Sequence, residues 1–169
     1  KGARQMAQLL GETTDANNYS RQMNKVKEGY NRCWNGYAYR HPEYNDCTDD
    51  RVQALAVVSG IAEQDKYPYI IDLFKKQFYA SPYMEKYVME ALFVMGEGKY
   101  AMERMQKRFA PMVNHPFYTT LFEGWDIGPN GFGGGTVNHA WSGGPLIVIA
   151  RYVCGIEPLD AAYKTFRIA

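Results

Sequence analysis

The sequence predicts an all-α fold made of helical hairpins, and three features support this class. Through the first two-thirds of the chain, apolar residues recur every three to four positions, the spacing of an amphipathic helix. Glycine, proline and short polar stretches divide this region into segments of about 12 to 19 residues. Segments that are apolar on nearly every face alternate with segments that have one apolar face, as expected for an inner and an outer ring of stacked hairpins.

The N-terminal part is expected to form two helices followed by a loop. A short helix over residues 2–10 precedes a glycine, and a longer helix, capped by Thr14 or Asp15, runs to about Cys33. The stretch 35–47 is rich in glycine, tyrosine and asparagine and is expected to be irregular.

Four further helices are predicted in the middle of the chain. Thr48 is expected to cap a helix whose body, 52–62, is apolar on nearly every face and should be buried all round. The next helix begins at Pro68, a favoured residue in the first turn. Ser-Pro opens a helix over 81–96, and a one-sided amphipathic helix follows over 99–112.

The last part of the chain differs from the rest in its composition and hydrophobic pattern. Eight of the sixteen glycines lie within 124–144, which is therefore expected to be a loop. A buried helix is predicted over 145–154, and 163–168 alternates apolar and polar residues like a strand that lacks its partner. We therefore expect a helical domain over 1–160, with about three hairpins, and the start of a β segment over 161–169.

Composition excludes several classes of protein. With 169 residues, 46% hydrophobic and 22% charged, the chain has the size and composition of one folded domain rather than of a disordered chain. Nineteen basic and eighteen acidic residues give a net charge of +1, so no basic field for nucleic-acid binding is expected. The longest run without charged or strongly polar residues, 143–150, is too short for a membrane span.

Several motif-based sites are also excluded. The three cysteines have no C-x-x-C spacing, and the three histidines lack metal-ligand spacing, so we expect neither a disulfide scaffold nor a metal site. The run Gly131–Gly135 follows no predicted strand and lacks the Gly-Lys-Ser/Thr of a phosphate loop. No cofactor is therefore expected.

The residues that point to chemistry lie at the two ends of the glycine-rich loop. Glu123 stands between Phe122 and Trp125, an environment that can desolvate a carboxylate and raise its pKa. The other polar and aromatic members of the group are Asp126, His139 and Trp141. Aromatic faces can dock the apolar face of a pyranose while polar groups select its hydroxyls, so the group suits a sugar site.

Each of these residues also has a purely structural interpretation. Glu123 could be a loop carboxylate that accepts backbone hydrogen bonds, and Asp126 before Ile-Gly-Pro could be a turn residue. His139 and Trp141 could be a pair that only packs the loop.

The stretch from Ser81 to Phe166 resembles the second half of the catalytic domain of bacterial α-L-rhamnosidases of the six-hairpin type. The elements that carry the resemblance are Ser81-Pro-Tyr-Met84, Thr119-Thr-Leu-Phe-Glu123 with Trp125, Asn138-His-Ala-Trp-Ser142 and Gly155-Ile-Glu-Pro158. Leu9-Leu-Gly11, and Asp15-Ala16 ahead of Tyr19, fit as well, and the stretch 35–47 fits least.

The resemblance implies an (α/α)6 barrel, of which this chain would form half, and hydrolysis with inversion at the anomeric carbon. It implies that Glu123 is the general base that activates water. It also implies that Trp125, His139 and Trp141 line the rhamnose pocket, with Tyr83 at the mouth of an inner helix.

The chain departs from the family pattern in its second carboxyl group. Inversion needs a general acid, which in the family lies upstream, in the first half of the barrel. Asp46, Asp49 and Glu85 are the nearest local carboxylates, but none lies in the family's acid motif. Gly124 and the long glycine-rich loop also differ from many relatives, which leaves the choice of substrate open.

We therefore expect an α-L-rhamnosidase-like glycosidase that is inactive as the isolated chain and that self-associates through the exposed face of its half-barrel. Its partner would be a rhamnose-containing glycan or glycoside, and family habit favours the periplasm or the outside of the cell. Two alternatives stay open: a non-catalytic helical module that binds carbohydrate or acts as a scaffold, and another hydrolase or lyase on the same toroid.

Overall fold

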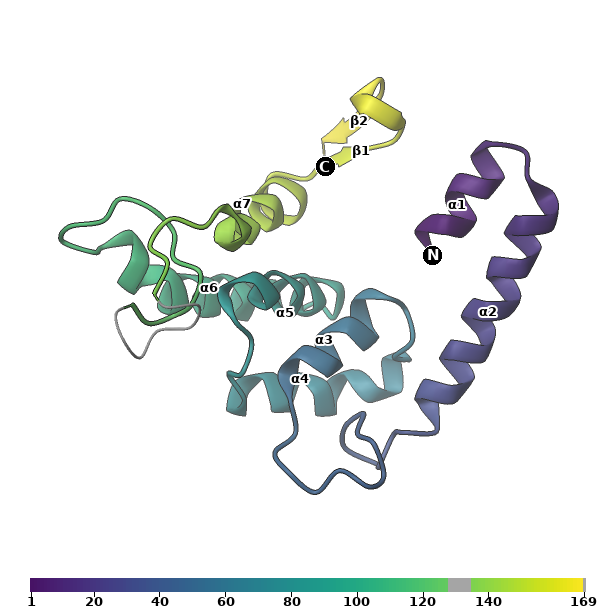
Figure 1. The fold of residues 1–169 in the computed structure, drawn as a ribbon, viewed down its shortest axis with the longest axis horizontal. Helices are drawn as coiled ribbons and strands as arrows, with labels where there is room; N and C mark the ends of the chain where they lie inside the picture. The colour runs from purple at the N-terminus through teal and green to yellow at the C-terminus, as the bar shows by residue number, and fades with distance from the viewer. Residues whose placement is uncertain (128–134, 169) are drawn as a thin grey trace.

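The computed structural model describes residues 1–127 and 135–168, and this part of the chain is mostly helical with a small antiparallel C-terminal sheet. In the described residues seven α-helices follow one another along an open arc, which begins with α1 and α2 and ends with α7 and the sheet (Figure 1). The all-α class is thus confirmed in outline. The structure shows an arc of helices and not a closed ring.

The first two helices form an antiparallel hairpin, α1 over Gly2–Leu9 and α2 over Thr13–Asn31. Gly11 between them has φ of +75°, which a glycine adopts without strain. The predicted cap at Thr14 or Asp15 is wrong by two or three residues: Glu12 occupies the N-cap position and its side chain accepts no capping hydrogen bond.

The second pair is α3 over Asp50–Val58 and α4 over Tyr67–Lys76. The Asp49 carboxylate, and not Thr48, caps α3 by accepting the backbone N–H of Arg51 at 2.8 Å. The helix ends at Val58 rather than at residue 62, because the chain turns at Gly60 with φ of +77°. The prediction that this helix is buried all round is also wrong, since Leu55 is 45% exposed.

The third pair, α5 over Pro82–Val94 and α6 over Gly98–Val113, is close to its prediction. Ser81 caps α5 by accepting the backbone N–H of Met84 at 3.3 Å. Proline in the first turn of α5 suits a helix start, because its missing N–H would have no partner within the helix.

The C-terminal elements differ most from their prediction. The short helix α7, Gly144–Val148, continues as a π-helical turn over Ile149–Val153. It is not buried as predicted, since its Leu146 is 73% exposed. The predicted unpartnered strand does have a partner: β2, Phe166–Ile168, pairs antiparallel with β1, Ile156–Pro158.

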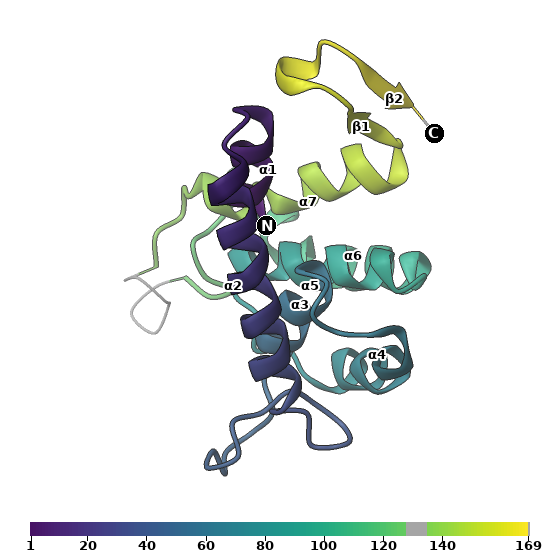
Figure 2. The ribbon, with the colours of Figure 1, turned by 90° about the vertical axis from the view of Figure 1, so that its right-hand side faces the viewer.

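The helices pack in two rows. Helix α3 packs on α5, and α5 packs on α7, while α4 and α6 pack against α3 and α5 respectively. Figure 2 shows the same order from the side, with α5 between α3 and α7. The apolar helices predicted for an inner row therefore do lie against each other.

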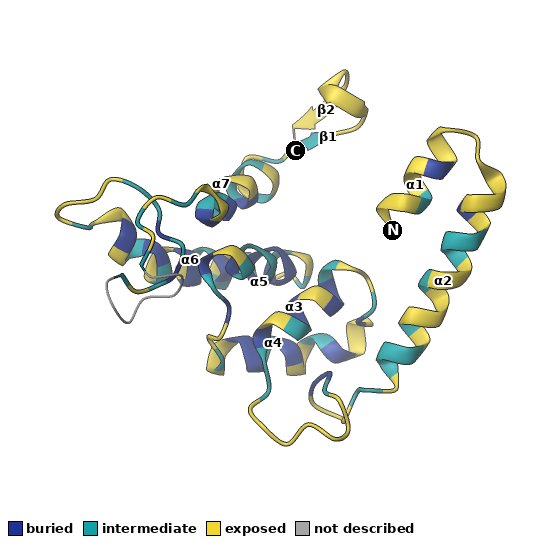
Figure 3. Cartoon of the chain, in the orientation of Figure 1, coloured by how far each residue is buried: buried dark blue, intermediate teal, exposed yellow. Residues whose placement is uncertain are grey.

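Buried residues concentrate on α3 to α6, as Figure 3 shows. One apolar cluster is centred on α3, α4 and α5, and a second joins α5, α6 and α7 to Phe122. No helix in the described residues is both long and apolar enough to span a membrane.

Four charged side chains lie inside this core and form what we call the buried charge cluster: Asp50, Glu85, Arg104 and Arg108. Arg104 donates to Asp50 at 2.8 Å and to Glu85 at 2.5 Å, and Arg108 donates to Glu85 at 2.6 Å. Because two carboxylates face two guanidinium groups, the cluster is neutral as a whole. It joins α3, α5 and α6.

Candidate functional site

An aromatic cluster of Tyr83, His139 and Trp141 forms where the N-terminal ends of α5 and α7 meet. The Tyr83 and Trp141 rings are stacked, with centroids 5.2 Å apart and planes at 30°. The His139 ring lies 4.4 Å from that of Trp141. Tyr83 is 40% exposed and Trp141 is 36% exposed, so part of each ring is open to solvent. The structure therefore brings together three of the predicted site residues.

Local sequence explains how Trp141 is placed. His139 occupies the N-cap position of a 3-10 turn over Ala140–Gly143, and its Nδ1 accepts the backbone N–H of Trp141 at 3.4 Å. Gly144, the first residue of α7, packs directly on Lys86 of α5. The absence of a side chain at this position lets α7 approach α5, and Trp141 approaches Tyr83 as a result.

Glu123 is tied to this cluster through its backbone. Its carbonyl accepts the indole N–H of Trp141 at 3.2 Å, and its N–H donates to the carbonyl of Thr136 at 3.0 Å. The same two stretches are joined again where the His139 N–H donates to the Leu121 carbonyl at 2.8 Å. The residues before and after the glycine-rich loop thus lie side by side.

The Glu123 side chain is half-buried and, in the described residues, has neither a hydrogen bond nor an ion pair. The interpretation of Glu123 as a carboxylate that accepts backbone hydrogen bonds therefore finds no support in these residues. A carboxylate that has no partner among the described residues could accept a hydrogen bond from a water molecule or from a ligand hydroxyl.

The contacts of Trp125 are with residues outside the aromatic cluster. Its ring packs edge-on against Phe109 at 5.0 Å, and its indole N–H donates to the carbonyl of Ala80 at 2.7 Å. The guanidinium carbon of Arg108 lies 4.2 Å from the ring centre. These contacts anchor Trp125 on α6 and on the residues just before α5, and its predicted role in lining a sugar pocket stays a prediction.

Asp126 is exposed, and in the described residues its carboxylate has no hydrogen bond or ion pair. It lies near the end of the described stretch that stops at residue 127. Both interpretations of Asp126, as a turn residue and as a sugar ligand, stay open.

The three local carboxylates considered in the sequence analysis as a possible general acid all have partners. Glu85 is fully buried and paired with two arginines in the buried charge cluster. Asp49 caps α3 and pairs with Arg51. Asp46 accepts the backbone N–H of Cys47 at 2.7 Å. Glu85 in particular has no access to a bound sugar, so it is not a candidate general acid.

Burial and neighbouring charges shift the pKa values of two acids at the start of α3. Burial raises the pKa of Asp50 above its usual value, although the guanidinium of Arg104 opposes this effect. Partial burial acts in the same direction on Asp49, but the hydrogen bonds and the charge of Arg51 outweigh it and lower the pKa of Asp49. Both pKa shifts thus arise from contacts at the start of α3.

Sequence reasoning missed the buried charge cluster, although the sequence contains a signal for it. Glu85 lies in a helix predicted to be buried, and a buried carboxylate requires an opposite charge. Arg104 and Arg108 lie four residues apart, on one face of the next helix, beside the apolar stripe.

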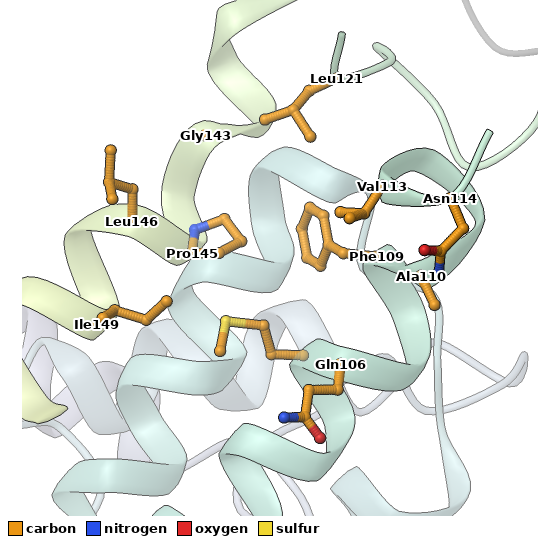
Figure 4. A pocket seen from close by; sticks show the side chains of 11 residues that line it. Gln106, Phe109, Ala110, Val113, Asn114, Leu121, Gly143, Pro145, Leu146 and Ile149 are labelled. Carbon is orange, nitrogen blue, oxygen red and sulfur yellow. The ribbon is translucent and has the colours of Figure 1, made fainter. Parts of the chain in front are cut away.

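A pocket of about 590 Å³ lies between α6 and α7 (Figure 4). Its lining is mostly apolar and includes Phe109, Val113, Leu146 and Ile149. Leu121 also lines it, but none of the predicted site residues does. The aromatic cluster is therefore an exposed surface feature and is not part of this pocket.

Among the described residues, no group of three or more histidine, cysteine, aspartate or glutamate side chains is arranged to hold a metal ion. Neither the protein-family models nor the curated proteins with which the sequence was compared give a match. The similarity to α-L-rhamnosidases therefore depends on the sequence motifs alone.

Proposed function

We propose that this chain is part of an inverting glycoside hydrolase of the α-L-rhamnosidase type and that it supplies the general base, Glu123. The observation that carries the proposal is the bond between the Trp141 indole and the Glu123 carbonyl. This bond ties the backbone of Glu123, whose carboxylate has no hydrogen bond or ion pair within the described residues, to an exposed aromatic surface, and an aromatic surface beside a carboxylate suits one half of an inverting site.

The chemistry assigns a separate task to each group. The stacked rings of Tyr83 and Trp141 would hold the apolar face of the sugar, and His139 would contact its hydroxyls. The Glu123 carboxylate would take a proton from a water molecule while the water oxygen bonds to the anomeric carbon. The glycosidic bond breaks on the opposite face, where a second carboxyl group, about 6.5–9.5 Å from the Glu123 carboxylate, protonates the leaving oxygen.

The arrangement of helices supports a toroidal architecture for the whole enzyme. Helices α3, α5 and α7 would belong to its inner ring, and α4 and α6 would belong to its outer ring. Because Glu85 and Asp49 are paired with arginines, the proposal places the general acid in polypeptide outside these 169 residues.

A non-catalytic sugar-binding module is the second candidate. Its support is the same pairing of Glu85 and Asp49, which removes two of the three local carboxylates considered as a second catalytic group. Binding would need only the aromatic surface and polar groups beside it, and no second catalytic carboxyl group.

The test is hydrolysis of an aryl α-L-rhamnoside by the complete enzyme and by its Glu123→Gln variant. Glutamine keeps the shape of the side chain but accepts no proton, so kcat should fall by about 10²–10⁴. Glu103→Gln is the matched control, because this glutamate is exposed on α6 and should leave kcat unchanged. A loss of less than tenfold in the Glu123 variant would exclude the general base. A complete protein that binds L-rhamnose but does not hydrolyse the rhamnoside would establish the binding module instead.

A further inference from the structure

Arg108 on α6 connects the candidate site to the core, and neither the sequence motifs nor the proposed chemistry assigns it a role. Its Nη2 donates to the carbonyls of Ala80 at 3.0 Å and Phe78 at 3.2 Å. The indole N–H of Trp125 donates to the same Ala80 carbonyl at 2.7 Å. The guanidinium group also covers the face of the Trp125 ring, at 4.2 Å from its centre.

The position of Arg108 is itself fixed by the core. Its Nη1 donates to Glu85, a fully buried carboxylate that Arg104 also holds. If the Arg108 side chain swung outward, the fully buried Glu85 would lose one of its two cationic partners. This is unfavourable for a buried charge, so the guanidinium stays where Trp125 meets it.

Trp125 in turn fixes the stretch that carries the proposed general base. Between α6 and residue 127 the described chain has no helix or strand, so its position depends on a few individual backbone and side-chain contacts. Trp125 holds this stretch on one side of Glu123, and the bonds of Glu123 to Thr136 and Trp141 hold it on the other.

We infer that Arg108 is a positioning residue, which clamps Trp125 on the Ala80 carbonyl and so fixes the backbone of Glu123 in the candidate site. Its importance for catalysis rests on the proposed function, whereas the clamp itself can be tested without it. Lysine cannot replace arginine here, because an ammonium group can pair with Glu85 but cannot also lie flat on an indole and donate to two carbonyls.

Hydrogen exchange followed by mass spectrometry tests the clamp on this chain. In Arg108→Lys, the amides of residues 119–127 should exchange about tenfold faster, while those of α5 keep their protection. Trp125→Phe keeps an aromatic ring but loses the indole N–H, and it should have the same local effect. Lys107→Gln is the control, an exposed residue next to Arg108. Unchanged exchange in 119–127 overturns the inference, and if Arg108→Lys does not fold, Trp125→Phe decides alone.

The catalytic consequence is measured in the complete enzyme. Arg108→Lys should lower kcat for an aryl α-L-rhamnoside about tenfold with a smaller change in KM, since the base is misplaced and the aromatic cluster is intact. An unchanged kcat contradicts the inference. An inactive wild-type enzyme counts against the proposed function only, because hydrogen exchange still shows whether Arg108 holds Trp125.

Discussion

At the scale of single residues, the two tryptophans of the proposed site differ in how much of each side chain is used to hold the fold together. The indole N–H of Trp141 donates a hydrogen bond to the Glu123 carbonyl, while part of the ring stays exposed beside Tyr83. Trp125 differs, because both its N–H and its ring face are used by Ala80 and Arg108. The two tryptophans should therefore respond differently to substitution.

Trp141→Ala should weaken binding of methyl α-L-rhamnoside by roughly tenfold or more, because loss of the ring removes about 1–2 kcal/mol of contact. Trp141→Phe keeps a ring against Tyr83 and should lose less. Isothermal titration calorimetry on the complete enzyme gives both affinities. Equal affinities for wild type and Trp141→Ala would remove Trp141 from the sugar site.

Sequence reasoning found contacts that follow from local spacing and failed where the partner is distant. The packing of His139 on Trp141 spans two residues and was one of the two interpretations considered, while their role in a sugar pocket stays a prediction. The partners of Glu85 lie on another helix, so this glutamate was considered as a nearby acid although it belongs to the buried charge cluster. The sequence can indicate that a buried glutamate needs a cationic partner, but only the tertiary structure shows which arginines supply it.

At the scale of elements, the start of α3 depends on one carboxylate. Asp49→Ala should destabilise the protein by about 1 kcal/mol at pH 7, the usual loss for a helix cap. The pKa of Asp49 is lowered in the fold, so its contribution is present above the unfolded pKa of about 3.9 and is lost as the pH falls through the lower folded value. The difference from wild type, measured by urea unfolding, should therefore shrink at acid pH. Thr48→Ala is the control. A larger loss of stability in Thr48→Ala than in Asp49→Ala would contradict the assignment of Asp49 as the cap. A loss in Asp49→Ala that stays the same at all pH values would contradict it as well.

The contact between α5 and α7 depends on a glycine. A Cβ added at Gly144 would lie 2.5 Å from the Cβ of Lys86 and would force the helices apart, although the backbone there is helical. Gly144→Ala should therefore destabilise the protein by roughly 1–3 kcal/mol. Gly143→Ala, whose Cβ meets no described atom within 4 Å, should change stability by less than about 0.5 kcal/mol. Equal thermal midpoints for the two variants would show that the helices are not in close contact.

Element boundaries were predicted well where the start or stop residue is unambiguous. Ser81 before Pro82 and the glycine at position 96 define α5 within a residue or two. The start of α3 was misplaced because Thr48 and Asp49 are equally good caps, and only the turn of the backbone selects between them. The strand pair β1–β2 was half missed because Ile156–Pro158 is too short to show an alternating pattern.

At the scale of the whole molecule, apolar side chains remain exposed at both ends of the arc. Leu9 on α1 is 86% exposed, and Leu146 and Ile147 on α7 are 73% and 58% exposed. Exposed apolar patches larger than about 400 Å² usually find a partner or lead to aggregation. The isolated chain should therefore dimerise or bind an apolar dye, which analytical ultracentrifugation and dye fluorescence detect. A monomer that binds no dye would argue against a missing half of the ring.

Closure of a toroid depends on contacts between distant helices, and the apolar pattern of a single helix does not specify such contacts. Alternating apolar and one-sided helices predicted two rows, and α3, α5 and α7 do pack in one row. The residues of the glycine-rich loop from 128 to 134, which separate the two parts of the candidate site in sequence, lie outside the described residues.

The measurement that tests the role of Glu123 most directly is rescue of a Glu123→Ala variant of the complete enzyme by azide. Azide fits the space of the missing carboxylate and its water, and it needs no base to attack the anomeric carbon of an aryl α-L-rhamnoside. If Glu123 activates water on the face opposite the leaving group, added azide restores release of the phenol and the product is β-L-rhamnosyl azide. No rescue, or a product of α configuration, would contradict the assignment of Glu123 as the general base of an inverting enzyme.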